Sequence, residues 1–213
     1  MPRLDHTHLR LHRTGSGPSL VLLHGLDETH EAWNGLAPLS DRFTLLSYDL
    51  PGHGDSFAPA TGFAIEDLSD QLAALLDREG IERTHVAGSS LGGMIAQHFA
   101  AAWPGRVDRL VLIDTTPGMS DGRKDELSTM HGRGPAHAAM AEADLMDLAE
   151  EIYAPTLILC AQGADLAMRG GADFLARSIP RGQLAFVPGA AVDAVAEQPA
   201  WVAAVLRDFL GRT

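Results

Sequence analysis

Short, continuous apolar runs alternate along the chain with longer stretches in which apolar residues recur every three or four positions. Continuous runs are typical of strands buried on both faces of a sheet, and the longer spacing is typical of amphipathic helices. The predicted strands are 4–13, 19–23, 43–48, 85–87, 109–113, 155–160 and 183–187, and the predicted helices are 29–39, 65–79, 91–102, 146–152, 172–179 and 199–210. This alternation predicts an α/β fold with a mostly parallel central sheet, helices on both faces and functional sites at the carboxyl ends of the strands.

Residues 117–143 interrupt this alternation. The segment is rich in glycine and polar residues and contains two histidines, His131 and His137. It offers little apolar surface to bury, so we expect an irregular excursion from the core and the most mobile internal part of the chain. No internal repeat is present, and residues 1–213 are predicted to form one domain.

Composition and charge narrow the range of partners. The chain has 16 basic and 28 acidic residues, a net charge of −12 that repels nucleic acids and anionic membrane surfaces, so we expect neither as a partner. The first residues lack an apolar signal core, and no stretch reaches the roughly 18 apolar residues of a membrane span. The single cysteine, Cys160, lies in an apolar run and is expected to be a buried, reduced thiol of a cytoplasmic protein.

The chemistry is concentrated in the segment THVAGSSLGG, residues 84–93. Gly88, Ser90 and Gly92 fit the pattern G-x-S-x-G between a predicted strand and a predicted helix, which is the context of a nucleophile elbow. We expect Ser90 to adopt a strained backbone conformation there, and a side chain at either glycine to collide with the neighbouring strand or helix. The helix that follows directs its first amides, including that of Leu91, toward any negative oxygen beside the serine.

Over nearly its whole length the chain resembles the α/β-hydrolase family, with the motifs in the family's order. They are His24-Gly25-Leu26, residues 49–56 in the pattern D-x-P-G-x-G-x-S, Ser90, and Pro155-Thr156-Leu157-Ile158. Within the family the chain looks most like small carboxylic-ester hydrolases and lactonases, such as the β-ketoadipate enol-lactonases. The resemblance implies that Ser90 is the nucleophile of an enzyme without cofactor or metal. It also implies that the amides of Leu26 and Leu91 form the oxyanion hole.

The same resemblance places the catalytic acid after the strand 155–160, where Asp165 is available. A carboxylate at that position would orient a histidine and stabilise its charged form. Asp114, at the end of the preceding strand, is the alternative acid because a carboxylate can reach the histidine from there as well.

The histidine is the point at which the chain departs from the family. The family pattern after the last strand is approximately P-G-x-G-H, with E-x-P opening the final helix. This chain has Pro188-Gly189-Ala190-Ala191-Val192 and then Glu197-Gln198-Pro199. Val192 therefore occupies the histidine position, and because valine cannot accept a proton, Ser90 is left without its general base.

Other histidines are candidates for a substitute base. His98 lies eight residues along the helix from Ser90, about 12 Å at 1.5 Å per residue, which is beyond hydrogen-bond reach. His53 lies in a loop at the correct end of the sheet, where a histidine more often shapes the turn. His131 and His137 lie on the irregular segment, which is loose enough to bring them to Ser90.

The segment 117–143 also stands where family members insert a lid of several helices, and it is too short for such a lid. A reduced lid implies an open pocket, or one covered by a second subunit in a homodimer. Two functions remain open from the sequence. One is a serine hydrolase of small esters or lactones with an incomplete triad. The other is a non-hydrolytic family member, namely a pseudoenzyme, small-molecule binder or lyase-type catalyst that uses the same pocket.

Overall fold

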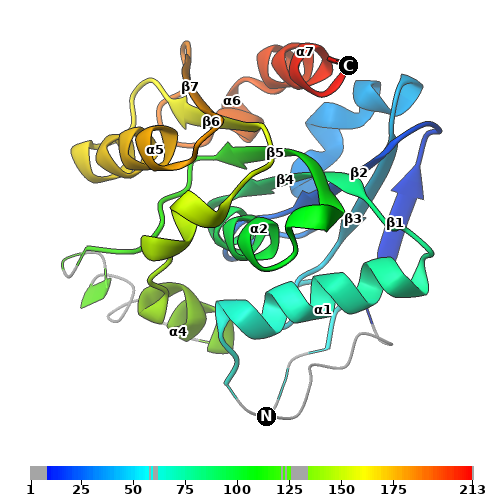
Figure 1. Cartoon of the computed structure of the whole chain (residues 1–213), viewed down its shortest axis with the longest axis horizontal. Helices are drawn as coiled ribbons and strands as arrows, with labels where there is room; N and C mark the ends of the chain where they lie inside the picture. Colours follow the sequence, from blue (N-terminus) through cyan, green and yellow to red (C-terminus); the bar gives the residue numbers. More distant parts are fainter. Residues whose placement is uncertain are drawn as a thin grey trace.

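A computed structural model describes residues 9–57, 59, 62–120, 122, 124–125 and 134–212. These residues form one sheet in the order β1-β3-β2-β4-β5-β6-β7, in which β1 is antiparallel to β3 and the other neighbours are parallel (Figure 1). The strands are β1 Leu11–Thr14, β2 Ser19–Leu23, β3 Thr44–Tyr48, β4 Thr84–Ser89, β5 Val107–Ile113, β6 Thr156–Ala161 and β7 Gly182–Val187. The predicted α/β class with a mostly parallel sheet is confirmed.

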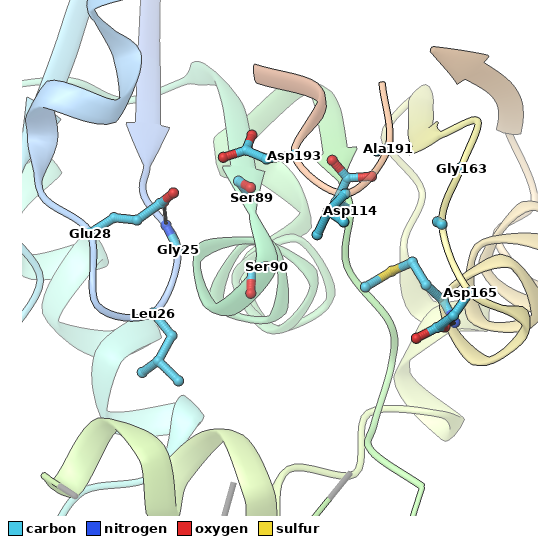
Figure 2. A pocket seen from close by; sticks show the side chains of 13 residues that line it. Gly25, Leu26, Glu28, Ser89, Ser90, Asp114, Gly163, Asp165, Ala191 and Asp193 are labelled. Atoms are coloured by element: carbon cyan, nitrogen blue, oxygen red, sulfur yellow. Dashed lines mark hydrogen bonds between the residues drawn. The ribbon is translucent and has the colours of Figure 1, made fainter. Parts of the chain in front are cut away.

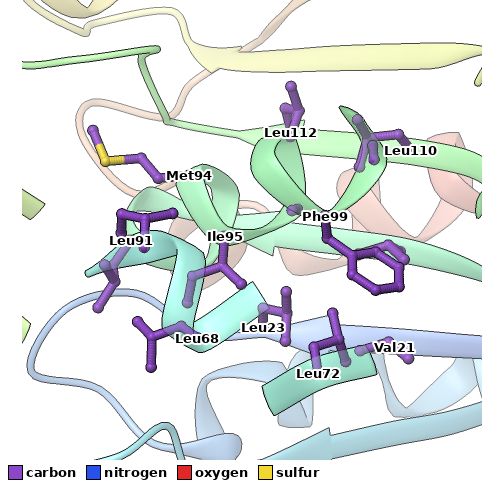
Figure 3. Packing of buried hydrophobic residues seen from close by; sticks show 14 of the residues in the cluster. Val21, Leu23, Leu68, Leu72, Leu91, Met94, Ile95, Phe99, Leu110 and Leu112 are labelled. Atoms are coloured by element: carbon purple, nitrogen blue, oxygen red, sulfur yellow. The ribbon is translucent and has the colours of Figure 1, made fainter. Parts of the chain in front are cut away.

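Helices cover both faces of this sheet. Successive strand residues point to opposite sides, and the strands are apolar on both sides, so each face needs a helical layer to bury it. On one face Val21 and Leu23 pack with the helices α1 (Ile65–Arg78) and α2 (Ser90–Ala102), as Figure 3 shows. The helices α4 (Pro135–Glu142), η3 (Asp147–Glu151) and α5 (Leu166–Ser178) also contribute to this cluster. The other face packs against η1 (His30–Asp41), α6 (Ala194–Glu197) and α7 (Pro199–Leu210). A short helix, η2 (Pro104–Arg106), precedes β5.

Three predicted helices differ from the observed ones. The structure forms 3₁₀ helices in η1 and η3, and α5 begins six residues earlier than the predicted range 172–179. Glycine is a poor helix former, so the pair Gly170 and Gly171 gives the first part of α5 a low helix propensity. In the structure, a Cβ on Gly171 would lie 2.4 Å from Cγ2 of Thr116, so this glycine allows α5 to pack closely on the strand-end loop.

The segment 117–143 is only partly described, and His131 lies outside the described residues. The prediction that it is irregular is wrong at its C-terminal end, where α4 forms. Pro135 is at the start of α4, where proline is favoured, and Ala136, Ala139 and Met140 are buried against the core. The mobility of the segment stays a prediction. Among the described helices, none has the length and apolar character required to span a lipid bilayer.

Candidate active site

The turn from β4 into α2 holds Ser90 in a left-handed conformation, with a φ of 49°. A non-glycine residue rarely adopts this φ, so the predicted backbone strain is confirmed. The flanking glycines are required by close packing. A Cβ on Gly88 would lie 2.2 Å from the carbonyl oxygen of Gly92, and a Cβ on Gly92 would lie 2.1 Å from that of Leu23. The elbow is therefore pressed against β2 as well as built from β4 and α2.

Two backbone amides are available beside the serine. Leu91 is in the first turn of α2, where N–H groups have no partner within the helix. Leu26 is in the loop after β2 and lines the same pocket as Ser90. Within the described part of the chain, neither amide donates a hydrogen bond. Both predicted oxyanion donors are thus free to bind an oxygen atom of a ligand.

His24 shapes the loop that carries Leu26. Its Nε2 accepts a hydrogen bond from the amide of Leu50 at 2.8 Å, so its Nδ1 donates to the carbonyl oxygen of Gly25 at 2.7 Å. Burial lowers the pKa of His24 to about 4, and the ring is neutral near pH 7. His24 is a structural link between the oxyanion loop and the loop after β3.

A pocket of about 460 Å³ opens above the elbow. It is lined by five of the residues singled out from the sequence, one from each of five separate segments: Leu26, Ser90, Asp114, Asp165 and Val192. Figure 2 shows Asp114 and Asp165 on the opposite side of Ser90 from Leu26 and Glu28. The carboxyl ends of the strands thus converge on one cavity, as expected for a parallel sheet.

Asp114, the alternative acid, links three elements at the end of β5. One carboxylate oxygen accepts from the amide of Ala161 at 2.7 Å and the other from the amide of Ala194 at 2.8 Å. Burial raises the pKa of Asp114 from 3.8 to about 6, although these two hydrogen bonds oppose the shift. Because both oxygens are engaged, Asp114 serves as a scaffold residue that ties β6 and α6 to β5.

The shift at Asp114 predicts a pH-dependent stability difference. The folded protein binds the proton of Asp114 more tightly than the unfolded chain, so this stabilisation is present below about pH 4 and is lost as the pH rises through about 6. Asp114→Asn keeps the side-chain size but cannot titrate. We expect the free energy of unfolding of the natural protein, relative to this variant, to fall by about 3 kcal/mol between about pH 4 and pH 8. Denaturant titrations measure it, and a pH-independent difference would contradict the assignment.

Asp165, the predicted acid, is exposed at the start of α5. Its side chain caps this helix by accepting a hydrogen bond from the amide of Met168 at 2.8 Å. The structure therefore places the carboxylate at the pocket and gives it a capping role that helix formation alone explains.

Val192, at the predicted histidine position, is in the loop between β7 and α6. Its side chain is 76% exposed and lines the pocket. The carboxylate of Glu197 fixes the loop by accepting from the amides of Ala191, Val192 and Asp193, each at 2.8 Å. These hydrogen bonds lower the pKa of Glu197. The loop conformation thus depends on Glu197 and on the backbone, and the Val192 side chain faces open space.

No histidine lines the pocket among the residues that the structure describes. His53 is buried; its Nδ1 lies 3.2 Å from the carbonyl oxygen of Pro51, and its ring packs edge-on against His24. His137 lies on α4 with its Nε2 3.2 Å from Oδ2 of Asp27. Neither of these candidate bases reaches the cavity, and His131 is outside the described residues.

Comparison with known proteins matches the sequence to one family. The sequence profile of the family described as alpha/beta hydrolase fold matches residues 18–134, more than half of the chain. The chain belongs to the α/β-hydrolase family.

Three relatives illustrate how far the similarity extends. An uncharacterized protein of Mycobacterium bovis is 40% identical over 113 residues, which are 52% of this chain and 33% of that protein. A pimeloyl-[acyl-carrier protein] methyl ester esterase of Nitrosomonas europaea is 28% identical over 84% of this chain and 90% of its own length. The crystal structure of the enol-lactonase from Burkholderia xenovorans superposes with a TM-score of 0.86, at 23% identity over 96% of both chains. The chain thus spans about one third of the mycobacterial relative, and the enol-lactonase similarity shows the fold alone.

Two charged pocket residues of this α/β-hydrolase were not among the candidate site residues predicted from the sequence. Glu28 accepts a hydrogen bond from the amide of Gly25 at 2.6 Å, and Asp193 caps α6. A Cβ on Gly25 would lie 2.7 Å from Oε2 of Glu28 and 3.3 Å from Cβ of Ser90, so the side chains of Glu28 and Ser90 both lie beside this glycine. The signal was present in the sequence, since Glu28 follows the oxyanion motif and Asp193 follows the vacant histidine position.

Proposed function

We propose that this α/β-hydrolase cleaves small carboxylic esters or lactones through Ser90, without a histidine base. The observation that carries the proposal is the strained Ser90, which faces a pocket beside the free amides of Leu26 and Leu91. Strain of this kind persists only where the surrounding structure enforces it, and it keeps the hydroxyl exposed above the sheet. The similarity to an esterase over most of both chains supports the same chemistry.

The reaction proceeds in two displacements. Ser90 Oγ attacks the carbonyl carbon of the ester, its proton passes to water, and the carbonyl oxygen becomes negative between the amides of Leu26 and Leu91. The bond to the alcohol breaks, the alcohol takes a proton from water, and an acyl-serine remains. Water then attacks the acyl group, releasing the carboxylic acid and the Ser90 hydroxyl.

The proposed reaction is slow because Val192 cannot accept the proton. In a serine triad, loss of the histidine reduces turnover on the order of a million-fold, whereas oxyanion donors and binding alone retain roughly 10³ to 10⁴ over water. The acyl-enzyme should therefore form slowly.

A second pocket provides space for an apolar part of the substrate. It has a volume of about 500 Å³ and shares Met168 with the Ser90 pocket. Its apolar lining includes Met119, Met146 and Phe174. Unbranched, polarizable methionine side chains adapt to ligands of varied shape, so this surface suits an acyl or alkyl chain.

The alternative is a family member that binds a small molecule without hydrolysing it. It is favoured by one observation, namely that no described residue lining the pocket is a histidine. An oriented pair of donors can still bind a carbonyl or carboxyl oxygen in the ground state. Both functions use the same cavity, so the state of the Ser90 hydroxyl separates them.

Covalent labelling tests the proposal. We expect a fluorophosphonate probe to modify Ser90, identified by peptide mass, and p-nitrophenyl acetate to be hydrolysed slowly. Both signals should disappear in Ser90→Ala, because the reacting oxygen is gone. Ser89→Ala is the matched control, since it removes the adjacent pocket hydroxyl and leaves the nucleophile. An inert Ser90 in a folded protein that still binds esters would favour the non-hydrolytic alternative.

A further inference from the structure

Carboxylates surround the nucleophile in this pocket. Figure 2 shows Asp193 beside Ser89, with Glu28 on one side of Ser90 and Asp114 on the other. Among the described residues that line the pocket there is no lysine, arginine or histidine. The position of the ligand site is inferred from the strained serine and the two free amides, without reference to these charges. The carboxylates then determine which ligands the site accepts.

Each of these carboxylates is held by backbone amides. Glu28 accepts from Gly25, and Asp114 accepts from two amides as described above. Asp193 accepts from the amides of Val195 and Ala196, at 3.0 and 2.9 Å. Hydrogen bonds of this kind fix the position of a carboxylate and leave its negative charge in place.

No described cation neutralises the three groups, because Glu28, Asp114 and Asp193 take part in none of the ion pairs between described residues. Burial, with a further contribution from the charge of Asp193, raises the pKa of Glu28. Burial is also the main cause at Asp114, and Asp193 again adds to the shift. Asp193 is therefore electrostatically coupled to both neighbours, and the three groups create a negative potential at the serine.

A charged ligand would experience this potential directly. If a ligand places a unit charge about 6 Å from one carboxylate, the binding constant of the ligand changes by roughly ten-fold or more at the effective dielectric constant of a protein surface. A cationic ligand binds more tightly and an anionic ligand binds more weakly. An anion at Ser90 would also meet Glu28 next to the oxyanion loop, where the donors are uncharged amides and serine hydroxyls.

We propose that Glu28 and Asp193 make the Ser90 pocket selective for esters that carry a positive charge and exclude esters that carry a carboxylate. The inference deepens the proposed function and rests on it only for the identity of the site. It separates this chain from an enzyme for β-ketoadipate enol-lactone, since the lactone of a dicarboxylic acid retains one free carboxylate. The cationic group lies on the Glu28 side of Ser90, opposite Asp165 (Figure 2), and the apolar group lies toward Met168.

Binding to the Ser90→Ala protein tests the selectivity without requiring turnover. Three esters are compared by titration calorimetry: acetylcholine, its uncharged carbon isostere 3,3-dimethylbutyl acetate, and 4-acetoxybutanoate. The first two have the same shape and differ in charge. We expect acetylcholine to bind more tightly than the isostere, by about ten-fold at least. We expect 4-acetoxybutanoate to bind more weakly than the isostere, again by about ten-fold at least.

Glu28→Gln in the Ser90→Ala background should reduce this discrimination several-fold. Glutamine keeps an oxygen that can accept from Gly25, so the loop is retained while the charge is removed. Glu31→Gln is the matched control, because it makes the same change in net charge at an exposed position outside the pocket, and discrimination should persist. If Glu28→Gln does not fold, Asp193→Asn replaces it, since asparagine can still cap α6.

The outcomes distinguish this inference from the hydrolase proposal. Equal affinities for the cation and the isostere, or no binding of the cation, would overturn the charge selectivity even if Ser90 reacts with the fluorophosphonate. Discrimination that is unchanged by Glu28→Gln and Asp193→Asn would overturn the assignment to these residues. Discrimination that depends on them would support the inference even if Ser90 proved inert, in which case only the hydrolytic function would fail.

Discussion

Replacing Val192 with histidine is expected to increase ester hydrolysis by about ten-fold or more, because a positioned general base activates the serine hydroxyl. The side chain at this position lines the same pocket as Ser90, and its loop is held by Glu197 through backbone amides that the substitution does not alter. We expect a partial gain, since Oδ1 of Asp165 already accepts the hydrogen bond that caps α5. The measurement is kcat/KM for p-nitrophenyl acetate.

Two controls give this result its meaning. An imidazole on a protein surface can hydrolyse an activated ester by itself, so the gain must disappear when Ser90→Ala is added to Val192→His. Val192→Asn, which is polar but cannot act as a base, should leave the rate near that of the natural protein. Efficient hydrolysis by the natural protein would contradict the argument, because it would mean that a base reaches Ser90 from elsewhere.

The second large effect concerns the elbow itself. We expect Gly92→Ala to lower the free energy of unfolding by about 4 kcal/mol or more, or to prevent folding. The added Cβ would lie 2.1 Å from the carbonyl oxygen of Leu23 and 2.6 Å from that of His24. Both contacts are with backbone atoms of the strand end beside α2, which cannot move aside without displacing the oxyanion loop. Denaturant unfolding measures the loss.

Gly105→Ala is the matched control for this prediction. Gly105 is on the surface helix η2, and a Cβ there would have no atom within 4 Å. Its stability should stay within about 0.5 kcal/mol of the natural protein. Similar stabilities for the two alanine variants would show that the close approach at Gly92 is relieved at little energetic expense.

The elbow could be predicted from the sequence because most of its physical requirements are local. The left-handed serine and the lack of room for a Cβ at Gly88 arise within five consecutive residues, Gly88 to Gly92, and only the contact of Gly92 with Leu23 involves another segment. The buried strands were recognisable for a similar reason, since β2 was predicted with its observed limits, Ser19–Leu23. Patterns that depend on neighbours in the chain survive the step from sequence to structure.

Features that depend on distant segments could not be predicted. Asp114 acts through the amide of Ala194, 80 residues away in the chain. Gly171 is tolerated inside α5 because Thr116 occupies the space beside it. The three carboxylates around Ser90 belong to Glu28, Asp114 and Asp193. These residues lie far apart in the sequence, which gives no indication that they line one pocket. The sequence therefore indicated Ser90 as the candidate nucleophile but gave no indication of the carboxylates around it.

The hydrogen bonds of Glu197 bear on how the loop between β7 and α6 can keep its shape without a histidine at position 192. A single carboxylate accepts hydrogen bonds from three consecutive backbone amides, so the loop between β7 and α6 keeps its shape whichever side chain is present at position 192. Folding therefore imposes almost no constraint on that position, and drift there is close to neutral for stability. Only natural selection for hydrolysis would preserve a histidine in such a loop. An ancestor that had one could exchange it for valine in a few mutational steps and remain folded, with its pocket intact and open to a different chemistry.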